Sequence, residues 1–222
     1  MIAVLDALKL EKPVLVGHSI AGAEMSAVAT SRPGRVAALI YLEAGYPYAF
    51  DNGKGPKMTE FQTSGPRSPS PSPADLASFA SLQNWDAEVF GFRMPEAEFR
   101  QTWDSDVSGR PRRARDSAGT QALQALMTSV KTYARIPVPA LVVFASPHVP
   151  ESWIGKVTDS RVQESARAYY AAIDAATARQ AAAFEAGVPS ALVVKLRGAH
   201  YIFLSNELET LRDNRSFLRG LN

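Results

Sequence analysis

A serine that could act as a nucleophile lies in the sequence GHSIAG, residues 17–22. This motif follows the apolar run PVLVG and precedes a stretch of helical character. A serine on such a sharp strand-to-helix turn has a strained backbone with positive φ, and its hydroxyl stands exposed. Gly17 and Ala21 are small enough to let the strand and the helix approach each other at this turn. We therefore predict that Ser19 is a nucleophile and that the Ile20 N–H is an oxyanion donor.

The general base that a serine nucleophile needs is most often a histidine, and the chain has three. His18 adjoins Ser19 and is expected to point away from it, so we interpret it as structural. His148 is expected in a loop after a later apolar strand. His200 follows the last apolar strand, in the sequence RGAHYIF. Because parallel strands all end at one edge of a sheet, His200 can meet Ser19 there, and we predict it as the base.

Two glutamates could orient the His200 ring. Glu43 ends the second apolar strand, in the sequence LEAGYPY, and Glu151 follows the third, in ASPHVPES. A carboxylate placed tightly against an apolar strand, as Glu43 is, needs a hydrogen-bonding partner to be tolerated. The sequence therefore favours Glu43 as the third member of a catalytic triad, and Glu151 stays open as the alternative.

Four apolar runs are expected to form buried parallel strands. They are apolar at consecutive positions, as strands covered on both faces are, and they span residues 13–17, 36–44, 139–145 and 191–199. Helices are expected at residues 2–10, 20–31 and 160–186, and a last helix after Asn206, where Glu209 completes a capping box. This alternation of strands and helices predicts an α/β fold with helices on both faces of the sheet.

A segment of different composition separates the second and third strands. It opens with the extended connector SGPRSPSPSP, residues 64–73. Helices are expected within it at 73–84, 95–103 and 118–134, with a polar loop over 104–117. We therefore predict an α/β core at residues 1–47 and 136–222 and an inserted helical cap at residues 48–135.

Composition excludes several other classes of protein. The 24 basic and 22 acidic residues give a net charge of +2, which does not favour nucleic acid or a membrane as a partner. The chain has no cysteine for disulfides or thiolate chemistry, and its motifs require neither a metal nor a cofactor. No apolar run reaches the roughly 20 residues of a membrane helix, and the first residues lack the basic region of a signal peptide. A cytoplasmic location is therefore expected.

The motif at 17–22, the run LIYLEAGYPYAF and the sequence RGAHYIFLSNE resemble the α/β-hydrolase superfamily, especially its cap-bearing members, over nearly the whole chain. In most members the acid follows the strand equivalent to 139–145. In some capped members, the haloalkane dehalogenases among them, it follows the strand equivalent to 36–43, as Glu43 does. Dehalogenases and epoxide hydrolases use an aspartate nucleophile, so Ser19 argues against both reactions and for acyl transfer.

The resemblance implies a serine hydrolase that acts on a small-molecule ester or related acyl substrate. C–C bond hydrolases and perhydrolases share the same triad and are an alternative. A non-catalytic remnant or ligand-binding protein of the same fold is another.

Members of the superfamily begin with several strands before the serine motif, whereas here only the end of one expected helix precedes PVLVG. The resemblance therefore implies the C-terminal part of the fold, with a four-stranded, mostly parallel sheet and without the loop that supplies a second oxyanion donor. Strand 13–17 would then be an exposed edge. We expect the chain to self-associate through that edge and to hydrolyse esters more slowly than an intact relative.

Overall fold

The computed structural model describes residues 1–61, 64–115 and 132–221. The chain divides into two compact units. The first comprises Met1–Thr63, Ala125–Val149 and Ala171–Asn222, and the second comprises Ser64–Gln124 and Pro150–Tyr170.

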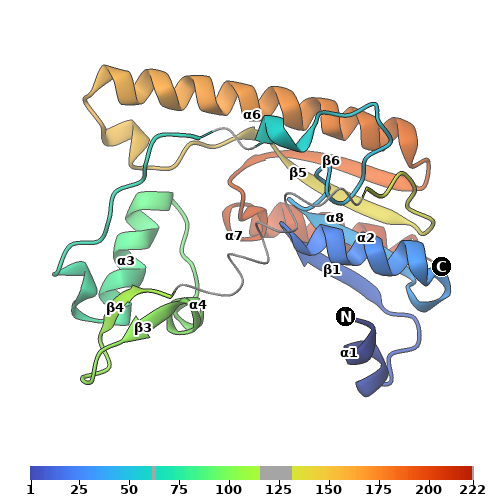
Figure 1. Cartoon of the computed structure of the whole chain (residues 1–222), viewed down its shortest axis with the longest axis horizontal. Coiled ribbons are helices and arrows are strands. Elements are labelled where there is room, and N and C mark those ends of the chain that lie inside the picture. The colour runs from blue at the N-terminus through green and yellow to red at the C-terminus, as the bar shows by residue number, and fades with distance from the viewer. Residues whose placement is uncertain (62–63, 116–131, 222) are drawn as a thin grey trace. The chain divides into compact units, whose positions relative to one another are not determined.

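The first unit is built on a four-stranded sheet in the order β1–β2–β5–β6. Figure 1 labels β1, β5 and β6 of this sheet. The strands are β1 (Val14–His18), β2 (Ala38–Leu42), β5 (Ala140–His148) and β6 (Ala191–Gly198), and each neighbouring pair is parallel. The expected α/β fold and its four strands are therefore confirmed. The main difference is that β5 continues as far as His148, so this histidine belongs to a strand and not to a loop.

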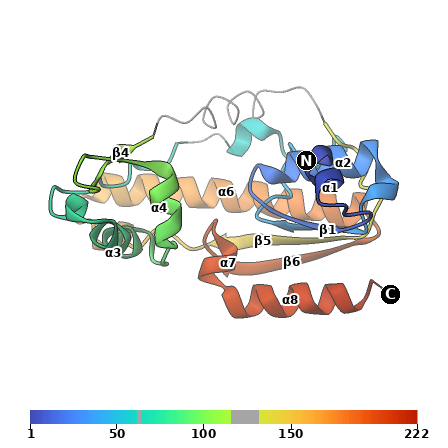
Figure 2. The ribbon, with the colours of Figure 1, turned by 90° about the horizontal axis from the view of Figure 1, so that it is seen from below.

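Helices cover both faces of this sheet (Figure 2). On one face, helix α2 (Ala21–Ser31) and the C-terminal part of α6 (Ser160–Gly187) pack on alternate strand residues: Leu39, Tyr41, Val142 and Phe144. On the other face, α7 (Ile202–Ser205) and α8 (Glu207–Arg219) pack on the residues between them: Ile40, Leu42, Leu141 and Val143. Because both sets are buried, the strands are apolar at consecutive positions.

Strand β1 lies at one edge of the sheet and follows the short helix α1 (Ile2–Ala7). Within the described residues β1 pairs only with β2, and Val16 in its middle is 56% exposed. An apolar edge strand with unpaired backbone groups favours pairing with another chain. Self-association through β1 therefore stays a prediction, and light scattering of the purified chain tests it.

The capping box expected at the last helix is wrong. Asn206 does precede α8, but its side chain does not accept a hydrogen bond from the first turn of the helix. The Asn206 amide instead donates to the Arg197 carbonyl, and its Oδ1 accepts from the Ser205 hydroxyl at 2.8 Å. The side chain therefore holds the end of β6 near the start of α8, which keeps the segment around His200 in place.

The second unit contains helices α3 (Phe79–Phe90) and α4 (Glu96–Thr102) around a small core of Phe79, Leu82 and Phe99. The polar loop expected at 104–117 is wrong in part, because β3 (Trp103–Ser105) and β4 (Pro111–Ala114) form an antiparallel hairpin. Its turn is stabilised by the Asp106 carboxylate, which accepts from the backbone N–H of Ser108 and of Arg110.

The bounds of the second unit differ from those expected for the cap. Residues 48–63 belong to the first unit, and residues 150–170 belong to the second. The helix expected at 118–134 lies almost wholly outside the described residues. That this unit covers an active site stays a prediction. Across the described ranges, no helix is long and apolar enough to span a bilayer.

Candidate active site

Ser19 lies on a sharp turn between β1 and α2, with a φ of 52°. This positive φ is the strained backbone expected from the sequence. A Cβ atom added to Gly17 would lie 2.8 Å from the Met25 sulfur and 3.0 Å from the Ala21 Cβ. A larger residue at position 17 would require Met25 and Ala21 to shift, so the strand and the helix meet closely at this turn.

The turn at Ser19 packs directly against the segment that follows β2. The Ser19 N–H donates to the Leu42 carbonyl at 3.3 Å. A Cβ atom added to Gly22 would lie 2.0 Å from the Ala44 carbonyl oxygen, so α2 approaches this segment at backbone distance. Ser19 and Glu43 are therefore neighbours at the carboxyl edge of the sheet.

The Ile20 N–H lies at the start of α2. Within the described residues this N–H donates to no backbone or side-chain acceptor. A free N–H at a helix N-terminus can donate to a developing oxyanion, so the position agrees with the role expected for Ile20.

Glu43 is fully buried at the end of β2, and its φ of 50° is also positive. Its Oε1 accepts from the Ala145 N–H at 2.6 Å, and its Oε2 accepts from the Tyr46 hydroxyl at 2.7 Å. Its backbone N–H donates to the Val143 carbonyl at 2.8 Å. These bonds fix both the backbone and the carboxylate of Glu43, and they supply the partners that burial requires.

The His200 ring lies against this carboxylate. Its Nδ1 is 3.1 Å from Glu43 Oε2, and the side chain is 46% exposed. Within the described residues, His200 Nε2 has no hydrogen-bond partner, and Ser19 is not bonded to it. The predicted base and the favoured acid are thus brought together, and one ring nitrogen is left free to exchange protons.

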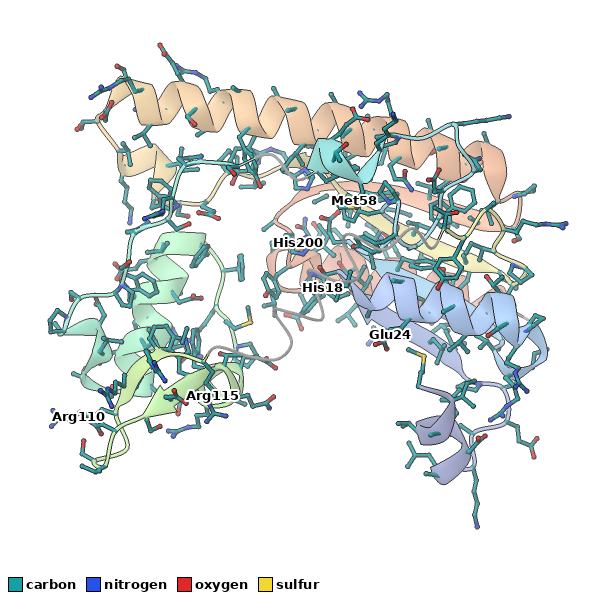
Figure 3. The ribbon with its side chains drawn as sticks, viewed as in Figure 1. His18, Glu24, Met58, Arg110, Arg115 and His200 are labelled. Atoms are coloured by element: carbon teal, nitrogen blue, oxygen red, sulfur yellow. The ribbon has the colours of Figure 1, made fainter. Side chains whose placement is uncertain are left out.

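His18 connects the Ser19 turn to the His200 loop. Its Nε2 donates to the His200 carbonyl at 3.0 Å, and the two ring centroids are 4.6 Å apart. Figure 3 shows the two side chains next to each other. Burial, followed by the charge of His200, lowers the pKa of His18 to about 4. His18 therefore stays neutral near pH 7, and its structural role stays a prediction.

Two tyrosines after β2 complete the surroundings of the site. Burial and the charge of Glu43 raise the pKa of Tyr46, so its hydroxyl stays a donor to Glu43. Burial also raises the pKa of Tyr48, whose phenol lies against Ser19. Neither tyrosine was singled out from the sequence, although both follow Glu43 in the run LEAGYPY.

Glu151, the alternative acid, belongs to the second unit. Its carboxylate accepts from the Ser68 hydroxyl at 2.9 Å and from the Trp153 indole N–H. Among the described residues, no histidine contacts it.

The structure adds two residues that sequence reasoning missed. His148, at the end of β5, places its Nε2 3.5 Å from Glu43 Oε2 and its Nδ1 2.7 Å from Asp174 Oδ1. Burial disfavours a charged Glu43, but hydrogen bonds and charges of His148 and His200 outweigh it and lower the pKa of Glu43 to about 2. The position of His148 at a strand end was a usable signal. Asp174 lies inside a long helix, and nothing in the sequence distinguishes it.

Comparison with known proteins gives one family. The model of the alpha/beta hydrolase family matches residues 1–213. No curated protein matches the chain.

The solved structures that are similar in fold include the following two. E-2-(acetamidomethylene)succinate hydrolase is 15% identical with a TM-score of 0.57, and the match covers 98% of this chain and 70% of that one. The thioesterase domain from the curacin biosynthetic pathway is 16% identical with a TM-score of 0.51, and the match covers 97% of this chain and 69% of that one.

Proposed function

Because this chain belongs to the alpha/beta hydrolase family, we propose that it is a serine hydrolase that cleaves an ester or a related acyl substrate. The proposed triad is Ser19, His200 and Glu43. The observation that carries the proposal is the bond between Glu43 and His200 Nδ1, at the sheet edge where the Ser19 turn lies. This bond leaves His200 Nε2 as the nitrogen that can take a proton from the serine hydroxyl.

His200 fits the role of base better than His148 does. Both nitrogens of the His148 ring face carboxylates, and its side chain is only 9% exposed. It therefore has no nitrogen free for Ser19. The His200 ring is half-exposed and bound at one nitrogen only, which is the arrangement that a proton shuttle requires.

In the proposed reaction, Ser19 Oγ attacks the acyl carbon while its proton passes to His200 Nε2. The Ile20 N–H donates to the oxyanion of the tetrahedral intermediate. His200 then protonates the leaving alcohol or thiol as the bond to the acyl carbon breaks. In the second half, His200 takes a proton from water while the water oxygen attacks the acyl-serine. The bond to Ser19 Oγ then breaks, His200 returns the proton to Ser19, and the carboxylic acid leaves.

Glu43 contributes through charge and orientation. Its carboxylate keeps the proton of neutral His200 on Nδ1, so that Nε2 carries the lone pair, and it stabilises the imidazolium that forms during attack. Because Tyr46 and the Ala145 N–H hold the carboxylate in place, this geometry exists before substrate binds.

Hydrolysis of p-nitrophenyl acetate and p-nitrophenyl butyrate by the purified chain tests the proposed function. We expect nitrophenol release that saturates with ester concentration, with an initial burst where deacylation is slower than acylation. Release no faster than with an equal concentration of serum albumin, at every pH between 6 and 9, would contradict it.

A further inference from the structure

A second histidine–carboxylate pair adjoins the proposed triad. His148 Nδ1 and the His148 backbone N–H both approach the same oxygen of Asp174, at 2.7 and 2.8 Å. On its other side the ring faces Glu43 Oε2 at 3.5 Å. Four side chains thus form one chain of contacts, in the order Asp174, His148, Glu43, His200. Asp174 lies on α6 and His148 on β5, while Glu43 and His200 follow β2 and β6.

The contacts of His148 determine its protonation state. A neutral imidazole has one N–H and one lone pair, whereas an imidazolium has two N–H groups. Both neighbours of the ring are carboxylates, which only accept hydrogen bonds when they are ionised. A neutral ring would turn a lone pair toward one of two buried or half-buried anions. The doubly protonated ring satisfies both.

We propose that His148 is a positioning residue that acts through Glu43. Held in place by Asp174, it stays an imidazolium and keeps the fully buried Glu43 ionised and available to His200. This inference rests on the proposed function, because it assigns Glu43 to the triad. It adds a role for two residues that never touch the substrate.

The proposal has a consequence for the pH dependence of hydrolysis. The titratable groups that face Glu43 are His148, His200 and Tyr46. The charge of Glu43 also acts, more weakly, on the pKa of Tyr48 and of His18. A positive charge at His148 opposes a second proton on the Glu43–His200 pair. Removing that charge makes the pair bind the second proton more tightly, so the pKa of the pair rises. As the pH falls, activity that requires neutral His200 is then lost at a higher pH.

The variant His148→Gln tests this consequence, because glutamine can still donate to Glu43 but carries no charge. We expect the acid limb of the pH profile of kcat/KM to move to higher pH by about one unit. This is the lower end of the pKa shift that a charge within about 4–6 Å causes. At pH 8.5, above the limb, we expect kcat within about tenfold of the wild type. A purely structural role would lower activity equally at every pH.

Asp174→Asn is the second variant. It should move the acid limb of the pH profile in the same direction but by less, because the His148 ring loses the carboxylate that holds it. Glu185→Gln is the matched control. Glu185 also lies on α6, half-exposed, and forms an ion pair with Lys195 at 3.2 Å. This control should leave the profile unchanged. An unchanged acid limb in a folded, active His148→Gln would overturn the proposal.

A measurement without activity separates this proposal from the proposed function. The chain has three histidines, so ¹⁵N spectra of the imidazole rings can be assigned by loss of the His148 signals in His148→Gln. At pH 7.5 we expect both His148 nitrogens to be protonated in the wild type. A neutral His148 ring would overturn the inference. If the wild type hydrolyses no ester, the proposed function fails and the ring spectrum alone decides the state of His148.

Discussion

Ser19→Ala is expected to lower kcat/KM for p-nitrophenyl butyrate by about 10⁴–10⁶-fold, the scale seen when a triad nucleophile is removed. The variant cannot form the acyl-serine, and only substrate binding and the oxyanion donor remain. Because alanine fills the same turn with one atom fewer, the positive φ at position 19 is no more strained than before. The melting temperature should therefore change little, and circular dichroism checks this.

Ser31→Ala is the matched control for this substitution. Ser31 ends the same helix, α2, and its hydroxyl donates to the Ala27 carbonyl on an exposed turn. We expect wild-type kcat/KM from it. If Ser19→Ala kept more than a tenth of wild-type activity while folded, Ser19 would not be the nucleophile.

Glu43→Gln is expected to lower kcat by about 10⁴-fold, the effect known for the same change of charge in a serine protease triad. Glutamine keeps the volume of the buried side chain and an oxygen for the Ala145 N–H. Its amide group, however, can present an N–H to His200 Nδ1, which favours the tautomer that has a proton on Nε2. The ring then cannot accept the Ser19 proton. Steady-state kinetics with p-nitrophenyl butyrate at pH 8 measures the loss.

Glu151→Gln is the comparison that decides between the two acids. Its carboxylate contacts Ser68 and Trp153, so the change should cost less than about tenfold in kcat, as distant polar changes do. A large loss in Glu151→Gln together with a mild loss in Glu43→Gln would give the role of the acid to Glu151.

The parts of the site that the sequence predicted share one physical property. Ser19, Glu43 and His200 each come directly after an apolar run, and parallel strands bring such positions to one edge. The choice between Glu43 and Glu151 could not be made in that way, because both glutamates follow strands. The proposal of Glu43 depends on contacts instead: its carboxylate lies against His200 Nδ1, whereas the Glu151 carboxylate accepts from Ser68 and Trp153.

The parts that were missed or wrong depend on particular side-chain and backbone contacts. Asp174 meets His148 across 26 residues, through the orientation of the long helix α6. The Asn206 side chain could have capped α8, but the Arg197 carbonyl and the Ser205 hydroxyl compete for it. The hairpin β3–β4 has short polar strands, so no apolar alternation indicated it.

A fluorophosphonate probe on the wild-type chain tests the central claim most directly, because it reacts with an activated serine and needs no knowledge of the natural substrate. Mass spectrometry of the labelled protein should show one adduct, on the peptide that contains Ser19, and none in Ser19→Ala. His200→Gln should label far more slowly, since the base that activates the hydroxyl is lost. An unlabelled wild-type protein, or an adduct on another serine with Ser19 unmodified, would contradict the account.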